Sequence, residues 1–226
     1  MESSKIPTIT VHTKHRKDSM QYRGKEILTY DIAYPAFSSA RYQRTLNGIN
    51  REYHIRAMRL EAYCRKELFF QAAEQLDYDM QHGYPPMQYQ AITEFDVTYN
   101  ANGFLSLYCD KYLYTGGAHG STTRTSDTWD VRTGRRVPLQ RFFPRGFDAN
   151  AYIIRSVNAQ IAKQISEGND VYFDDYEKNV AESFDPKNYY LTLEGIAVYF
   201  QQYAIAPYST GIPVFIIPFV KPSPRR

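Results

Sequence analysis

In the first third of the chain, the spacing between apolar side chains changes from two residues to three or four residues. Residues 7–13 and 26–34 alternate apolar and polar side chains, which is the pattern of half-buried β-strands. We therefore expect two early strands that lie side by side. From residue 41 to residue 81, apolar side chains recur every three or four positions, which predicts a long amphipathic helix.

The ends of this helix carry residues that are typical of helix caps. Ser38 or Ser39 suits its start, and Gly83, followed by a pair of prolines, predicts its end. About 40 helical residues would span about 60 Å, at 1.5 Å for each residue. Because this is longer than a domain of this size is wide, we expect a break near Gly48 or a bend.

The middle of the chain predicts an antiparallel meander of three strands. Residues 88–114 alternate on both sides of an Asn-Ala-Asn-Gly turn at 100–103, because Asn and Gly tolerate the positive φ of a tight turn. Residues 121–131 form a polar, threonine-rich third strand. Residues 132–135 turn the chain back from it.

The last third of the chain predicts two helices and then three strands. Residues 148–166 carry an apolar stripe that ends before a glycine, and a shorter helix covers 174–184. The strands follow at 189–193, 196–201 and 213–219.

Together these elements predict an α+β fold. Antiparallel sheets are covered by a long helix from the N-terminal half and by a second helix from the C-terminal half. We expect an N-terminal strand-helix-hairpin domain at 1–115 and a C-terminal α+β domain at 116–226, packed together as one compact unit.

The overall composition excludes some classes of function. Twenty-seven Lys and Arg against 24 Asp and Glu leave a charge of +3, too small for a nucleic-acid-binding field over the whole surface. A mean hydropathy of -0.54 and the lack of a long apolar run predict no membrane span. Residues 1–5 lead into a strand-like segment without a secretory signal, so the chain as written is expected in the cytoplasm.

The charges are unevenly distributed along the chain. Residues 132–145 hold five Arg and no acid, whereas 167–187 hold seven acids and two Lys. These stretches are typical of solvated loops and helix faces, but the second one also suits an acidic patch on the surface.

Three local patterns are candidates for a functional site. Residues 114–120 place three glycines and a histidine between two strands, which suits either a structural bend or a loop that admits an anion or a partner. Asp174 and Asp175 suit a solvated helix start better than a cation site. Residues 199–211 are rich in Tyr, which suits either a buried irregular crossover or aromatic anchors for a partner.

The sequence offers little machinery for catalysis. A hydrolase would have to pair His119 with Asp127 or Asp130, and neither spacing is a known signature. We expect no catalytic residues, no metal and no cofactor. Cys64 and Cys109 have no zinc-site spacing, so we expect two mostly buried thiols, with a single bridge as the alternative.

Several of these motifs, in this order, resemble a known bacterial family. Residues 114–120, 130–135, 193–195 and 199–211 resemble the paired domains of unknown function in the extracytoplasmic part of the bacterial anti-sigma-V factor. Residues 30–35 and the helix segment that follows resemble the companion N-terminal domain, which also precedes the catalytic domain of a peptidoglycan deacetylase.

This resemblance implies a non-enzymatic α+β module that binds a protein partner, either lysozyme or another cell-wall-active protein. It also implies an extracytoplasmic location if an export signal has been trimmed. A cationic lysozyme would have to use the acidic region at 167–185, because the total charge is positive. The alternative is a module that binds peptidoglycan or glycan fragments. The expected partner-binding residues are Tyr114, Gly116, Gly117, His119, Asp174, Asp175, Tyr203 and Tyr208.

Overall fold

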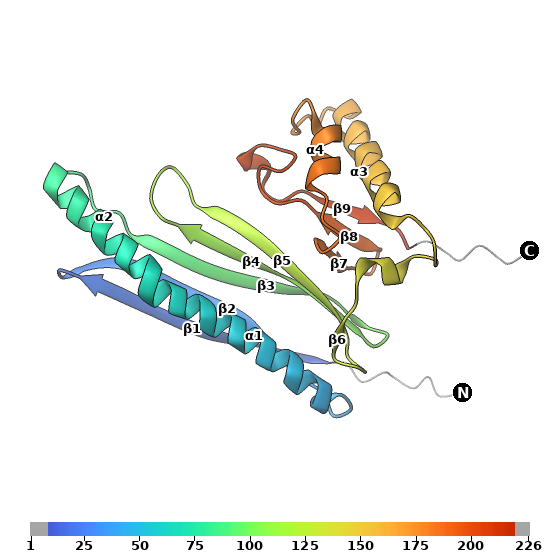
Figure 1. Ribbon diagram of the computed structural model, residues 1–226, viewed down its shortest axis with the longest axis horizontal. Helices are drawn as coiled ribbons and strands as arrows, with labels where there is room; N and C mark the ends of the chain where they lie inside the picture. The colour runs from blue at the N-terminus through green and yellow to red at the C-terminus, as the bar shows by residue number, and fades with distance from the viewer. Residues whose placement is uncertain (1–8, 220–226) are drawn as a thin grey trace, which may run out of the picture. The chain divides into compact units, whose positions relative to one another are not determined.

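The computed structural model describes residues 9–219 and has the expected α+β fold (Figure 1). One sheet has six strands in the order β1-β2-β3-β4-β5-β6, and the other has three in the order β7-β8-β9. The chain forms two compact units. Unit 1 holds residues 9–96, Cys109–Thr123 and Val131–Gly134, and unit 2 holds Val97–Tyr108, Arg124–Asp130 and residues 135–219.

Three strands contribute to both units. These are β3 (Tyr89–Ala101), β4 (Phe104–Tyr114) and β5 (Ser121–Asp130), and the chain passes from one unit to the other within each of them. The predicted boundary between residues 115 and 116 lies in the loop that joins β4 to β5, and it stays a prediction.

Unit 1 begins with a long antiparallel hairpin. Strand β1 (Thr10–Tyr22) pairs with β2 (Lys25–Ser38) through a turn in which Arg23 and Gly24 have φ values of 50° and 73°. Two adjacent residues with positive φ are typical of a tight hairpin turn. The first strand is longer than predicted because β1 lies at the sheet edge, where polar side chains stay in water and no alternation is needed. The predicted residues 7 and 8 lie outside the described part of the chain.

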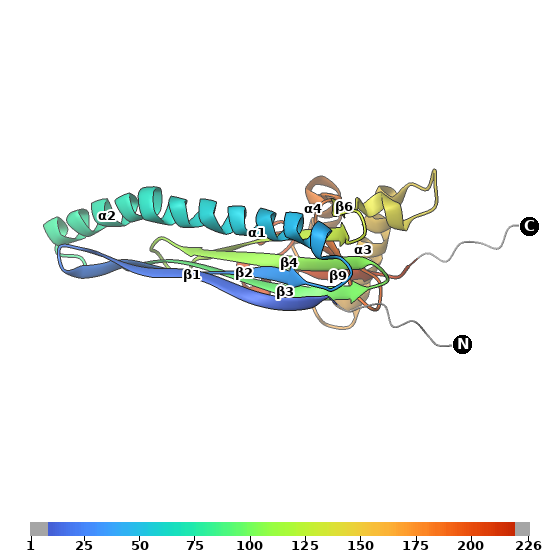
Figure 2. The same ribbon diagram turned by 90° about the horizontal axis from the view of Figure 1, so that it is seen from below.

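The long helix exists, but its interruption is not where we expected it. It consists of α1 (Gln43–Tyr63), a π-helical turn (Cys64–Leu68) and α2 (Phe69–His82). Gly48 lies inside α1, so the expected break there is wrong. The helix runs along β1 and β2 rather than across them (Figure 2). Fourteen residues of β2 span about 46 Å, so the hairpin can support most of the helix's length of about 60 Å.

The caps of this helix agree with the prediction at one end only. Gly83 ends α2 with a φ of 73°, as the sequence predicts. At the start, the N-cap residue is Tyr42 and no side chain caps it, so the expected cap by Ser38 or Ser39 is wrong. The Ser39 hydroxyl instead accepts a hydrogen bond from the amide of Arg41 at 3.4 Å.

The core of unit 1 forms between the helix and one face of the hairpin. Leu28, Tyr30 and Ile32 alternate on β2 and pack in one cluster with the buried stripe of the helix, which includes Cys64 and Leu68. Strand β3 pairs with β2 in parallel, because the chain returns along the helix before it enters the sheet. This pairing corrects the expectation of purely antiparallel sheets.

The predicted turns after β3 are present. Asn102 and Gly103 have φ values of 53° and 81° and connect β3 to β4. Strand β5 turns back into β6 (Arg135–Arg136), with which it pairs antiparallel. The neighbouring order of β3, β4 and β5 in the sheet agrees with the expected meander.

Unit 2 contains the remaining helices and the smaller sheet. Helix α3 (Ala149–Ser166) is capped by Asp148, whose side chain accepts from the amide of Ala151 at 3.1 Å. The other elements are α4 (Tyr176–Ser183), β7 (Tyr189–Leu191), β8 (Ile196–Tyr199), β9 (Val214–Ile217) and two short 3-10 turns (Leu139–Phe142 and Tyr208–Thr210).

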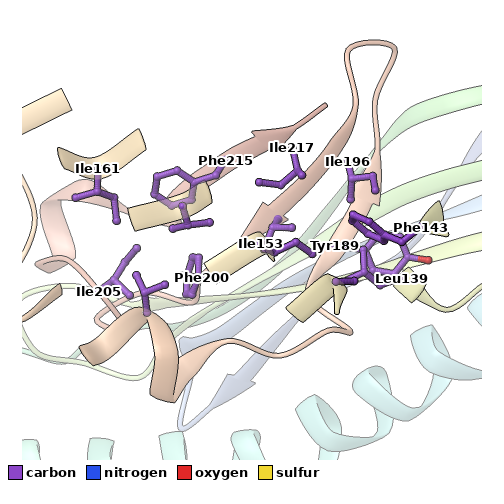
Figure 3. Packing of buried hydrophobic residues seen from close by; sticks show 14 of the residues in the cluster. Leu139, Phe143, Ile153, Ile161, Tyr189, Ile196, Phe200, Ile205, Phe215 and Ile217 are labelled. Atoms are coloured by element: carbon purple, nitrogen blue, oxygen red, sulfur yellow. The ribbon is translucent and has the colours of Figure 1, made fainter. Parts of the chain in front are cut away.

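The core of unit 2 packs α3 against one face of this sheet. Ile153 and Ile161 from α3 join Ile196, Phe215 and other buried side chains in one cluster (Figure 3). All four residues of β8 are buried. The opposite face packs against the part of the larger sheet that belongs to unit 2, where the Tyr108 and Tyr190 rings lie 5.1 Å apart.

Three further findings concern the two cysteines, membrane-spanning helices and metal-binding groups. Cys64 and Cys109 are not joined in a disulfide; Cys64 is fully buried, as we expected, whereas Cys109 is only partly buried. Among residues 9–219, no helix combines the length and apolar character that a bilayer-crossing helix needs. Within the same residues, no group of three or more His, Cys, Asp or Glu side chains is placed to hold a metal ion.

Candidate functional site

The glycine-rich loop between β4 and β5 belongs to unit 1 and is shaped by its packing. Gly116 and Gly117 have φ values of 98° and 85°, and the Tyr114 hydroxyl donates to the carbonyl oxygen of Gly117 at 3.0 Å. A Cβ at Gly120 would lie 2.5 Å from the carbonyl oxygen of Leu113 and from the Tyr112 ring. These contacts favour the structural interpretation of the three glycines.

The hydrogen bonds of the postulated catalytic residues also fit structural roles. The Nδ1 atom of the His119 ring lies 3.0 Å from the carbonyl oxygen of Gly120. Asp127, in unit 2, accepts from Nε of Arg136 at 2.6 Å and is only 7% exposed. The Asp127 carboxylate is therefore engaged with a side chain of its own unit.

In unit 2, two predicted segments that are far apart in the sequence lie side by side. The amide of Phe173 donates to the carbonyl oxygen of Ile205 at 3.2 Å. The Thr210 hydroxyl donates to the carbonyl oxygen of Val171, also at 3.2 Å. These two bonds place the acidic residues 170–177 next to the tyrosine-rich residues 203–211.

The tyrosine-rich segment contains both buried apolar residues and an exposed ring. Ile205 and Ala206 are buried in the core of unit 2, as a buried crossover requires. Tyr203 is 55% exposed and has a φ of 64°, and its ring lies 5.8 Å from the ring of Tyr208. The crossover is therefore anchored by its apolar residues, and the exposed Tyr203 ring lies beside the partly buried Tyr208 ring.

The carboxylates of the acidic segment are exposed. Asp175 accepts a hydrogen bond from the side chain of Asn179 at 2.7 Å, which fixes it at the start of α4. The nearest cation in the sequence is Lys178. Its Nζ atom lies 3.9 Å from Oε1 of Glu182, so it pairs with an acid outside this segment. Among residues 9–219, no ion pair involves the acids of this segment. These are Asp170, Asp174, Asp175 and Glu177.

We call the surface formed by residues 170–177 and 203–211 the acidic tyrosine surface. It contains four of the eight partner-binding residues that the sequence predicted: Asp174, Asp175, Tyr203 and Tyr208. The other four belong to the glycine-rich loop of unit 1. Their predicted role in binding stays a prediction.

Sequence reasoning missed a pocket in unit 2. It has a volume of about 650 Å³. It is lined by residues from β5, β6, the segment that follows β6, the start of α3, and the start of β7 with the segment before it. The only signal in the sequence was the run of five Arg at 132–145, which did not indicate which Arg is held in place.

Two family models match separate parts of this chain. Residues 22–122 match the model described as Deacetylase PdaC, and residues 141–220 match the model described as Protein of unknown function (DUF3298). A comparison with curated proteins gave no significant match.

Solved structures with the same fold come from two bacteria. A member of the DUF3298 family from Bacteroides fragilis is 21% identical, with a TM-score of 0.65, and the match covers 93% of this chain and 90% of that chain. A DUF3298 family protein from Pseudomonas aeruginosa is 18% identical, with a TM-score of 0.57, and the match covers 93% and 91%. This chain thus carries a PdaC-like segment followed by a DUF3298-like segment, in a fold similar to that of solved DUF3298 proteins.

Proposed function

We propose that this protein is a non-enzymatic module that binds a basic protein through its acidic tyrosine surface. The observation that carries the proposal is the exposed Tyr203 ring next to the partly buried Tyr208 ring, in a segment that two hydrogen bonds hold beside uncompensated carboxylates. In line with the resemblance of its motifs to the anti-sigma-V factor, we propose lysozyme or another cationic cell-wall-active protein as the partner.

The two kinds of side chain would contribute differently to binding. Tyrosine buries a large ring at a low cost in conformational entropy, and such rings often dominate the energy of an interface. Exposed carboxylates contribute mainly to the rate and selectivity of association with a basic partner, and salt weakens their effect. The burial of Ile205 supports this arrangement, because a fixed backbone presents the rings without a further ordering cost.

Titration calorimetry with hen lysozyme as the probe tests this proposal. Tyr203→Asn removes the ring but keeps a residue that tolerates positive φ. We expect it to weaken binding about ten-fold or more, as loss of a central aromatic contact does. The combined change Asp174→Asn and Asp175→Asn should weaken binding about five-fold at low salt and less at high salt.

Matched controls separate this surface from general effects of charge and aromatic content. Glu74→Gln with Glu194→Gln removes the same charge at exposed positions outside residues 167–185, and Tyr84→Asn removes a 56% exposed ring from unit 1. Both controls should bind like the unchanged protein. Equal losses in the controls and in the surface variants, or no binding of lysozyme at all, would overturn the proposal for this partner.

A glycan fragment is the second candidate ligand, because the exposed Tyr203 ring and the neighbouring Tyr208 ring can stack on sugar faces. Titration with chitooligosaccharides and muropeptides distinguishes the two candidates. Binding of these sugars that Tyr203→Asn abolishes, without any binding of lysozyme, would favour the glycan. His119→Ala addresses the glycine-rich loop, since a contribution of this loop to either ligand should appear as weaker binding.

A further inference from the structure

The pocket in unit 2 is distinct from the acidic tyrosine surface and has a different charge. Its volume of about 650 Å³ is in the range that holds ligands of a few residues. The lining residues are Ser126, Asp127, Thr128, Arg136, Val137, Pro138, Leu139, Gln140, Asn150, Pro186, Lys187 and Tyr189.

Arg136 is held in a fixed position at this pocket. Its Nε donates to Asp127 at 2.6 Å, and its guanidinium carbon lies 4.4 Å from the centre of the Trp129 ring. Asp127 is buried, whereas the Arg136 side chain is 45% exposed. A guanidinium that is oriented by a buried carboxylate and an aromatic face is pre-organised to bind a planar anion.

The charges that line the pocket favour an anionic ligand. Asp127 compensates Arg136, which leaves the positive charge of Lys187. In the described part of the chain, Lys187 takes no part in an ion pair. Asn150 is the second residue of α3, so the pocket also reaches the positive end of this helix.

The remaining lining groups suit a peptide. Val137, Pro138 and Leu139 supply an apolar wall. The Tyr189 hydroxyl is occupied by the carbonyl oxygen of Val137, so this residue contributes its ring and not its hydroxyl. Gln140 donates through Nε2 to the carbonyl oxygen of Phe147 at 3.0 Å, which leaves its amide oxygen as an acceptor for a peptide N–H.

We propose that this pocket binds the free carboxylate end of a short peptide, with Arg136 and Lys187 as the cationic groups that recognise the carboxylate. The ligand carboxylate lies between these two side chains, and the preceding residue packs against Val137 and Pro138. This site goes beyond the proposed binding of a basic protein and does not depend on it.

A pair of probes that differ only in the carboxylate tests this inference. We expect N-acetyl-Ala-Ala to shift the backbone amide NMR signals of residues 126–128, 136–140 and 186–189. N-acetyl-Ala-Ala-amide, which has the same shape without the charge, should bind about ten-fold more weakly, as expected for a lost charge-assisted contact. Equal affinity for the two peptides, or no shift with either at millimolar concentration, would overturn the proposal.

Substitutions then assign the recognition to the two cations. Lys187 lies on the surface, and the substitution Lys187→Gln should weaken binding of the acid peptide about five-fold. The combined change Asp127→Asn and Arg136→Gln leaves no unpaired buried charge, and it should weaken this binding about ten-fold. Lys178→Gln is the matched control on α4 and should leave peptide binding unchanged.

Two further measurements separate this site from misfolding and from the acidic tyrosine surface. Thermal unfolding of each variant shows whether it is folded, and only folded variants are compared. If both folded pocket variants bind the acid peptide like the unchanged protein, the assignment to these two side chains is wrong. Lysozyme binding should be the same in the pocket variants as in the unchanged protein, so that the two proposals can fail separately.

Discussion

The two units bury their sheets in different ways. In unit 1 a single helix covers one face of the long β1–β2 hairpin, and β2 shows buried positions on that face next to partly exposed positions on the other. In unit 2 the short strand β8 is buried at all four positions, because α3 covers one face and other strands cover the opposite face. A sheet that is covered on one side keeps an alternating pattern, and a sheet that is covered on both sides loses it.

The two units also differ in where their charged side chains lie. Unit 1 carries an ionic network at the edge between helix and hairpin, in which Arg16 and Arg65 pair with Glu61 and Asp18. Unit 2 has ion pairs along α3 and α4 and between β5 and β6, and its two candidate binding surfaces also include loop residues such as Asp174, Tyr203 and Lys187. Binding residues on loops above a packed scaffold are a common arrangement, because the scaffold holds them in place.

The largest expected effect comes from cavities in the two cores. Leu68→Ala in unit 1 and Ile161→Ala in unit 2 each remove a fully buried side chain. Each should lower the free energy of unfolding by about 2–5 kcal/mol. Urea unfolding measures this loss, and hydrogen exchange should show the weakened amides in the unit that carries the substitution. Weakened amides only in the other unit would contradict the division into two cores.

A steric clash at the glycine-rich loop should lower the free energy of unfolding somewhat less than a core cavity does. Gly120→Ala forces a methyl group against the Leu113 carbonyl and the Tyr112 ring, and we expect a loss of about 1–3 kcal/mol. Gly117→Ala meets no atom within 4 Å, so only its φ of 85° opposes the change. The cost at Gly117 should be the smaller of the two, about 1 kcal/mol, by the same unfolding measurement. The reverse order would argue against packing as the reason for Gly120.

The two units should lose stability in different alkaline pH ranges. Burial raises the pKa of the Cys64 thiol in unit 1 from 9.0 to about 11, and the pKa of Tyr189 in unit 2 from 10.0 to about 12. Each folded unit therefore favours the neutral group. The contribution to stability is complete below the unfolded pKa and is lost as the pH rises through the folded pKa.

Unfolding free energies measured from pH 8 to pH 12 check these ranges. Cys64→Ala should flatten the decrease between about pH 9 and 11, and Tyr189→Phe the decrease between about pH 10 and 12. If neither substitution changes the slope, other groups control the alkaline transition.

The smallest expected effect is a gain in stability. Gly48 lies inside α1, and a methyl group added there would meet no atom within 4 Å, so alanine fits without strain. Gly48→Ala should raise the free energy of unfolding by about 0.5–1 kcal/mol, because glycine is a poor helix former. A decrease in thermal stability would indicate that the helix needs flexibility at this position.

The sequence by itself determined the elements whose cause is local. The turn at Asn102 and Gly103, the start of α3 near residue 148 and the end of α2 at Gly83 follow from backbone preferences and short-range hydrogen bonds. The same reasoning located the acidic and tyrosine-rich segments, but it could not show that they lie together.

Only the tertiary structure decided the features that depend on distant residues. The parallel pairing of β3 with β2, the unbroken path of the long helix past Gly48 and the bonds between residues 171–173 and 205–210 each join segments more than 30 residues apart or depend on such contacts. The Asp127–Arg136 pair is close in sequence, yet its position in a pocket depends on α3 and on Lys187. Such contacts are selected by the burial of the whole core, which no short window of sequence encodes.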